Sequence, residues 1–150
     1  MTLNYQQVTR HFGHLFPIHI EALCELLIVL RQQFQGDLDL MLILAIISSR
    51  AMPARQGQTT DMSYSQFISD QSKERADQPI NIQSIAECSG IPRETVRRKV
   101  NKLEALDFIK RDAQGMLEVT DIAIHKLKPA TEATLHYLIA LGKGSSIVDA

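Results

Sequence analysis

A chain of 150 residues is long enough for one domain, or one domain with an accessory element, and a hydrophobic content of 45% can fill a core. The formal net charge of −1 argues against a protein that is basic over its whole surface. The chain begins without a signal-peptide pattern, and its longest apolar run, Leu40 to Ile47, is too short to span a bilayer. We therefore expect a cytoplasmic protein that does not associate with membranes.

The first helical pattern follows Pro17, a residue that suits the first turn of a helix. Beyond it, apolar residues recur at steps of three and four, at Ile20, Leu23, Leu27 and Leu30. Gln35 and Gly36 should end this helix, because glycine tolerates the left-handed conformation that follows a helix C-terminus.

Asp37 is placed to cap a second helix, from Leu38 to about Met52, by accepting backbone N–H bonds. Both helices contain apolar runs, LLIVL and LMLIL, and a helix that is apolar all round must be buried on several sides. In so small a chain a second copy would cover them most economically, so we expect a homodimer. Residues 1–52 are interpreted as N-terminal helices that supply dimerisation and the first helix of the following core.

Residues 53–79 form a polar stretch that is rich in Gln, Ser and Asp and has a proline near each end. This composition favours a long surface connection with one short helix around Tyr64–Ser69. A solvated insertion without a specific role is the simplest interpretation of it.

Residues 80–120 are the most informative part of the chain. Pro79 to Ile82 is a short β-type run, and Ser84 to Ser89 is a short helix whose Ile85, Ala86 and Cys88 should face inward. Gly90 supplies a positive φ for a tight turn, and a second helix runs from Pro92 to Leu106. Between Ile91 and Arg111 seven basic and three acidic residues give +4, whereas residues 1–78 carry −2. Positive charge is therefore concentrated on this segment.

The second helix separates its apolar and charged side chains onto opposite faces. At about 100° per residue, Val96, Val100 and Leu103 should face the core. Three outward residues have the chemistry of base-edge contacts, because arginine pairs with guanine and glutamate accepts from cytosine: Arg93, Glu94 and Arg98. The residues expected at the DNA backbone or flanking it are Thr95, Arg97, Lys99, Asn101, Lys102, Lys110 and Arg111.

A β-hairpin and a C-terminal helix follow. Asp107 to Arg111 leaves the helix as a strand, Asp112 to Gly115 is a turn, and Met116 to Val119 returns. The tip of the hairpin carries no Arg or Lys, so deep insertion into the minor groove is not expected. Residues 121–150 are interpreted as a C-terminal helix and tail. Thr120 should cap a turn that Pro129 interrupts, before a last helix from Ala130 to Leu141 that stops at Gly142.

Residues 80–120 resemble the winged helix-turn-helix of bacterial transcriptional regulators. The stretch PRETVRR, from Pro92 to Arg98, is similar to the recognition-helix motif of the cyclic-AMP receptor family, [ST]-R-E-T-V-x-R, although proline replaces the first residue. There the matching Arg, Glu and second Arg read base edges, which the resemblance carries over to Arg93, Glu94 and Arg98. The N-terminal half lacks a strand-rich nucleotide-binding domain, so a cyclic nucleotide is not implied.

The order of elements is more similar to the MarR family, whose members act as dimers. The sequence thus predicts a mainly α fold, a winged helix-turn-helix with extra N-terminal helices, a C-terminal helix and a small β-hairpin wing. The function that it implies is a sequence-specific regulator that binds double-stranded DNA as a homodimer. Two alternatives stay open: a winged helix that binds proteins, and a regulator with an apolar pocket for a small-molecule effector.

Catalytic and metal chemistry have little support in the sequence. Cys24 and Cys88 lie in apolar helical patterns without a CxxC motif, which favours two buried thiols in a reduced protein. His11, His14 and His19 have no further ligand nearby to complete a metal site. No phosphate-binding loop or nucleophile motif is present, so we expect neither an enzyme nor a bound cofactor.

Overall fold

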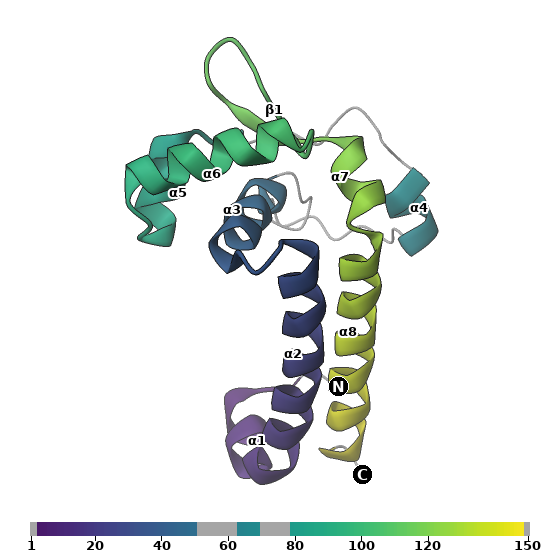
Figure 1. Cartoon of the computed structure of the whole chain (residues 1–150). Coiled ribbons are helices and arrows are strands. Elements are labelled where there is room, and N and C mark those ends of the chain that lie inside the picture. The colour runs from purple at the N-terminus through teal and green to yellow at the C-terminus, as the bar shows by residue number, and fades with distance from the viewer. Residues whose placement is uncertain (1–2, 51–62, 70–78, 149–150) are drawn as a thin grey trace. The chain divides into compact units, whose positions relative to one another are not determined.

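The structure is a computed structural model that describes residues 3–50, 63–69 and 79–148 (Figure 1). The described part is mainly helical with one two-stranded antiparallel sheet, which confirms the expected class in its broad sense. In chain order the elements are α1 (Tyr5–Arg10), α2 (Phe12–Gln33), α3 (Leu38–Ser49), α4 (Tyr64–Ser69), α5 (Ile82–Ser89), α6 (Arg93–Ala105), β1 (Ile109–Arg111), β2 (Leu117–Val119), α7 (Asp121–Lys126) and α8 (Lys128–Val148).

The chain divides into two compact units. The terminal unit contains α1, α2 and α8, which come from the two ends of the sequence. The central unit spans Asp37–Lys126 and contains α3 to α7 with the sheet. The two long helices that the sequence places early in the chain therefore belong to different units.

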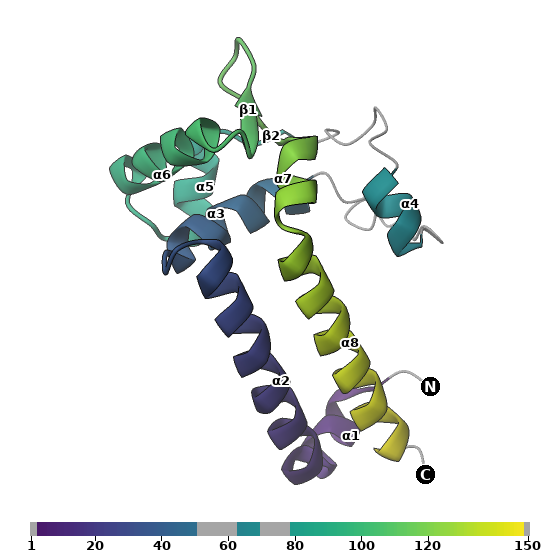
Figure 2. The ribbon, with the colours of Figure 1, turned by 45° about the vertical axis from the view of Figure 1, so that its right-hand side comes forward.

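In the terminal unit α2 and α8 lie side by side and antiparallel (Figures 1 and 2). Gly144 makes the close approach near the C-terminus of α8: a Cβ there would lie 3.2 Å from Cδ1 of Ile18. Nδ1 of His19 and the hydroxyl of Tyr137 form a hydrogen bond of 2.8 Å between the two helices. The pair is thus held by one close backbone contact and one polar contact between its faces.

In the central unit α3, α5, α6 and the hairpin enclose one apolar core. Its fully buried side chains come from every element of this group, and they are Leu40, Ile43, Ile85, Val96, Val100, Leu103 and Leu117. The inward positions expected in α6 are confirmed, since Val96, Val100 and Leu103 are all 0% exposed. Burial of side chains of this size stabilises a fold by about 1.5–3 kcal/mol each.

The sheet is a short hairpin that continues from α6. β1 and β2 pair so that Ile109 lies opposite Val119 and Arg111 lies opposite Leu117. The backbone of Ile80 forms an isolated antiparallel bridge to Leu117, which ties the start of α5 to the hairpin. The run from residue 79 to 82 thus contributes a single bridge.

Several local expectations from the sequence are confirmed. The backbone is left-handed at Gly36 (φ 83°) and at Gly90 (φ 74°), where each glycine follows a helix. Asp37 caps α3 by accepting from the N–H of Leu40 at 2.9 Å, and Thr120 caps α7 through the N–H of Ala123. The short helix expected within the polar stretch is α4, while residues 53–62 and 70–78 lie outside the described part.

Two helix boundaries differ from the prediction. Pro17 lies inside α2, because the helix already begins at Phe12; the backbone carbonyl of Gly13, which loses its partner at Pro17, lies on an exposed residue. α8 does not stop at Gly142 but continues to Val148. Packing of Gly144 against Leu15 and Ile18 outweighs the weak helix propensity of glycine there.

Three further expectations are wrong: the burial of the two cysteines, the start of α5 and the end of the expected second helix. Cys24 and Cys88 are exposed rather than buried: Cys24 lies on a part of α2 that α8 leaves uncovered, and Ile85 is the residue of α5 that is fully buried. α5 begins at Ile82 rather than Ser84, because the side chain of Asn81 caps it. The expected second helix ends at Ser49, and Met52 lies outside the described residues.

α2 is long and apolar enough to cross a membrane when judged by length and composition alone, with a mean hydropathy of 1.6 over its most apolar part. Core helices of soluble proteins meet the same criterion, so this property is weak support for a membrane span.

Candidate nucleic-acid interface

The α5–turn–α6 segment is fixed by side-chain caps and one left-handed glycine. Asn81 accepts from the N–H of Ser84 at 2.9 Å, which begins α5. Gly90 donates its N–H to the carbonyl of Ala86, and the hydroxyl of Ser89 accepts from the N–H of Ile91 at 3.1 Å. Each backbone group of the turn named here therefore has a partner, and α6 leaves the turn in a defined direction.

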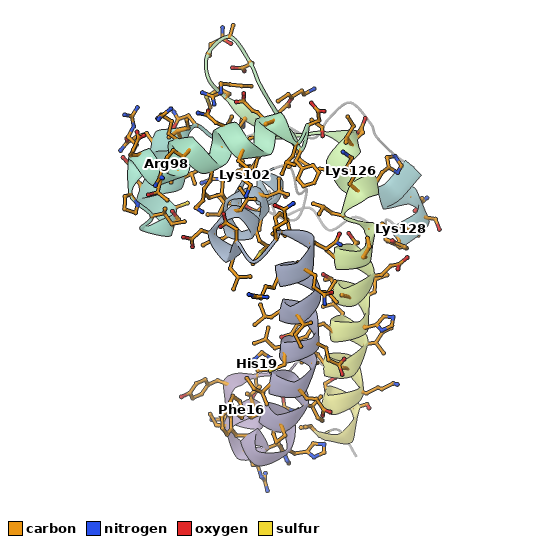
Figure 3. The ribbon with its side chains drawn as sticks, in the orientation of Figure 1. Phe16, His19, Arg98, Lys102, Lys126 and Lys128 are labelled. Atoms are coloured by element: carbon orange, nitrogen blue, oxygen red, sulfur yellow. The ribbon has the colours of Figure 1, made fainter. Side chains whose placement is uncertain are left out.

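α6 presents a charged face on the side away from the core. Val96, Val100 and Leu103 anchor it, and the residues between them are exposed or half-buried. Figure 3 shows Arg98 and Lys102 one after the other along this helix. The predicted base-edge and backbone residues from Arg93 to Lys102 are thus brought together on one helix, with Lys110 and Arg111 on β1.

Glu94 and Arg97 form an ion pair along the helix. Nε and Nη2 of Arg97 donate to the two carboxylate oxygens of Glu94 at 2.9 and 2.6 Å. The hydrogen bond from Arg97 lowers the pKa of Glu94 and outweighs its slight burial, and the same bond raises the pKa of Arg97. Both side chains are about half exposed or more, so other partners can reach them.

Lys99 is held away from solvent by Asp37. Its Nζ donates to Oδ1 and Oδ2 of Asp37 at 2.9 and 2.7 Å, and both side chains are about 22% exposed. Burial alone would raise the pKa of Asp37, but the hydrogen bond from Lys99, the N–H of Leu40 and the charge of Lys102 lower it. One carboxylate therefore caps α3 and fixes α6 against it.

The two basic residues of β1 also have acidic partners. Arg111 donates through Nε to Glu104 at 2.6 Å and through Nη2 to Asn101 at 3.3 Å, which links the hairpin to the C-terminal half of α6. Lys110 lies 3.4 Å from a carboxylate oxygen of Glu118 on β2. Arg111 thus positions the hairpin, and Lys110 is mostly exposed.

Three cations of α6 form no close ion pair among the described residues, although their charges act on Glu94 and Asp37 at longer range: Arg93, Arg98 and Lys102. All three are exposed. Arg98 makes one weak contact, from Nη2 to the hydroxyl of Thr95 at 3.5 Å. These side chains are free to meet an anion without breaking an existing ion pair.

The hairpin tip is compact and lacks basic residues. Gly115 donates its N–H to the carbonyl of Asp112 at 3.0 Å, which closes the expected turn, and Gly115 has a φ of 79°. The carboxylate of Asp112 accepts from the N–H groups of Gln114 and Met116, each at 2.9 Å. The tip is therefore a small loop held by its own backbone and by the carboxylate of Asp112.

Sequence reasoning missed three residues that shape this surface. Asn81 and Ser89 fix the two ends of α5, and Asp37 orients Lys99. The Asn81 cap had a sequence signal, because an amide residue stands directly before the helical pattern. The contact of Asp37 with Lys99 had none, since 62 positions separate the two residues.

Within residues 3–50, 63–69 and 79–148, no three His, Cys, Asp or Glu side chains form a group that could hold a metal ion.

The sequence matches no protein-family model, and comparisons with curated proteins and with solved structures find no similar protein.

Proposed function

We propose that the chain is a sequence-specific DNA-binding transcriptional regulator whose central unit is a winged helix-turn-helix. In this proposal α5 and α6 form the helix-turn-helix, α3 is the remaining helix of the core, and β1 and β2 form the wing. The protein acts as a homodimer, and each copy places one α6 in the major groove of a half-site. The element order supports this proposal through its resemblance to dimeric bacterial regulators of the MarR type.

The proposal depends mainly on the cations of α6 that form no close ion pair. Arg93 stands at the N-terminus of the helix, where recognition helices reach base edges, and Arg98 lies on the face opposite the core. An arginine without an acidic partner can donate two hydrogen bonds to guanine O6 and N7. Glu94 lies between them and can accept from cytosine N4 once Arg97 turns toward a phosphate.

The remaining basic residues divide into phosphate contacts and supports. Lys102 and Arg97 flank the reading face, and Lys110 is exposed on β1, so we assign all three to the DNA backbone. Thr95 and Asn101 lie beside them on α6. Lys99 and Arg111 hold α6 and the hairpin in place through Asp37 and Glu104, and they act on DNA through that geometry.

Selection of bound sites from random duplex DNA tests this function. We expect a roughly palindromic site with half-sites about one helical turn apart, since a two-fold dimer presents two copies of α6. We also expect affinity to fall as salt rises, because lysine and arginine displace counterions. Binding without any sequence preference would contradict sequence-specific recognition, and no binding at all would favour a protein-binding module.

Replacement of Arg98 by alanine tests the reading face. The variant should lose about 1–3 kcal/mol of specific binding and relax the preference at one base position. Arg10→Ala is the matched control, because it removes the same exposed charge from α1. Equal losses in both variants would mean that only net charge matters, and unchanged base preference in Arg98→Ala would remove Arg98 from the reading face.

A further inference from the structure

The terminal unit has almost no core of its own. Among its described residues only Ala22, Phe34, Ala130 and Gly144 are buried. An antiparallel pair of helices buries one side of each helix, and helices in stable bundles contact at least two neighbours. The pair is therefore incomplete as a folded structure.

α2 carries a second apolar stripe in addition to the side that packs on α8. The stripe recurs at steps of four and three and consists of Phe16, Ile20, Leu23, Leu27 and Leu30. At about 100° per residue it lies roughly 110° around the helix from the side that contacts α8. Phe16, Ile20 and Leu27 are still 37–44% exposed, although the ring of Phe12 stacks on that of Phe16.

α8 carries an uncharged stripe with the same spacing, in which two leucines lie among small and hydroxyl residues. It consists of Thr131, Leu135, Leu138, Gly142 and Ser145. Leu138 at its centre is 56% exposed. The hydroxyls of Thr131 and Ser145 donate to carbonyls of their own helix, so burial of this stripe would leave neither of them without a partner.

Both stripes lie on the same face of the antiparallel pair formed by α2 and α8. The α8 stripe also lies roughly 115° from its contact side, and in the same rotational sense as the α2 stripe. A two-fold axis perpendicular to their common plane relates two antiparallel helices, so equal rotations reach the same face. We call the ten residues of the two stripes the apolar face.

The apolar face itself contains no charged residue, although Arg31 and Lys128 lie at its edges, roughly 60° around their helices from the two stripes. On α2 the other side carries Glu21 and Glu25, and on α8 it carries Glu132 and Lys143. Steps of four and three on adjacent helices are the pattern of helices that pack with small crossing angles. The pair formed by α2 and α8 thus has the form of one half of a four-helix bundle.

We infer that the apolar face binds the apolar face of a second copy of this chain, so that α2 and α8 of two copies form a four-helix bundle. An uncharged face is complementary to itself, as a two-fold interface requires. The inference specifies the homodimer of the proposed function and rests on that function for its biological purpose.

The size of the face fits such a dimer. Helices of this length are about 30 Å long, and two of them side by side are about 20 Å wide. Each copy would bury roughly 600 Å², or about 1,200 Å² for the pair, which is the lower limit for specific interfaces.

Lipid is a poorer occupant of the apolar face. A span by α2 would place Glu21 and Glu25 inside the bilayer, where carboxylates are costly. A helix that lies on a membrane surface needs basic residues along its polar side, and α2 presents acidic ones there.

The test measures the mass of the full chain in solution without DNA, by sedimentation across a wide dilution series. The wild-type chain should be a dimer, and Leu27→Glu should weaken dimerisation by at least about 100-fold, because each copy loses a buried leucine. Ile28→Glu is the matched control: Ile28 is more exposed than Leu27, at 57%, but lies outside the apolar face. It should remain dimeric.

A second pair of variants covers the case in which Leu27→Glu loses its helical circular dichroism. Leu138 and Ile139 on α8 are both 56% exposed, and only Leu138 belongs to the apolar face. Leu138→Glu should dissociate the dimer, whereas Ile139→Glu should not.

A monomeric wild type, or equal dissociation by the variants on and off the apolar face, would overturn the inference. Binding of a monomeric wild type to phosphatidylcholine or phosphatidylserine vesicles would assign the face to lipid instead. The outcome is separable from the DNA proposal. A dimer that binds no DNA refutes DNA recognition but not the interface. A monomer that still recognises a half-site refutes the interface and the homodimer but not DNA recognition.

Discussion

The central and terminal units bury their apolar residues in opposite ways. α3 in the central unit has four buried residues, and α5, α6 and the hairpin surround it. α2 in the terminal unit is nearly twice as long and has one buried residue, Ala22. Both helices are strongly apolar in sequence, so composition alone does not tell a closed core from a face that awaits a partner. The number of packed neighbours makes that difference.

The largest effect should come from a cavity in the closed core, where Leu103 is 0% exposed. Leu103→Ala should lower the free energy of unfolding by about 2–5 kcal/mol. Leu138→Ala in the terminal unit should lower it by an amount that depends on protein concentration, because in the proposed dimer the lost contacts are between copies. Denaturant unfolding at two protein concentrations measures the loss of stability in both variants. An equal loss that does not depend on protein concentration would contradict the difference between the two units.

An intermediate effect is expected where one carboxylate joins α3 to α6. Asp37→Asn keeps a side-chain oxygen that can cap α3 but removes the charge that holds Lys99. It should cost about 1 kcal/mol of stability, since the pair is only partly buried. Asp39→Asn, an exposed carboxylate on the same turn, serves as the control and should cost less.

The same variant has a pH signature. The pKa of Asp37 in the folded state lies below its ordinary value of 3.8, so the charged carboxylate stabilises the fold above that pH. This stability is lost as the pH falls through the folded pKa. The wild-type chain should therefore lose its advantage over Asp37→Asn below about pH 4. A constant difference between the two proteins from neutral to acid pH would contradict this role of the pair.

The smallest effect concerns the exposed pair on the reading face. Glu94→Gln should free Arg97, which raises affinity for DNA of any sequence, and should relax the preference at a position where cytosine is bound. Competition binding with specific and random duplexes separates the two changes. Glu132→Gln on α8 is the control, because it removes the same charge from a distant part of the sequence. It should change both the base preference and the affinity for DNA less than Glu94→Gln does. An unchanged preference in Glu94→Gln would remove Glu94 from base reading.

The sequence predicted best where a local rule determines the structure. Gly36 and Gly90 take positive φ, Asp37 and Thr120 cap their helices, and the inward residues of α6 follow helical spacing. Each of these depends on neighbours within a few positions. The outward face of α6, with its predicted contact residues, follows from the same spacing.

Properties that depend on distant residues were predicted less well. The end of α8 is set by packing of Gly144 on α2. The orientation of the Lys99 side chain is set by the carboxylate of Asp37, which lies far away in the sequence. The exposure of Cys24 depends on which side of α2 meets α8, which the periodicity of α2 alone does not determine. Each of these requires knowledge of the tertiary neighbours.

The hydrogen bonds of the β1–β2 tip indicate which of its residues can be replaced without changing the loop. Its turn is closed by backbone groups and by the carboxylate of Asp112, so the side chains of Ala113 and Gln114 have no part in holding it. The base of the hairpin is fixed separately, through Arg111 and Glu104. Positions 113 and 114 can therefore change their chemistry without refolding the loop. We expect related chains to vary at these two positions and to keep Asp112.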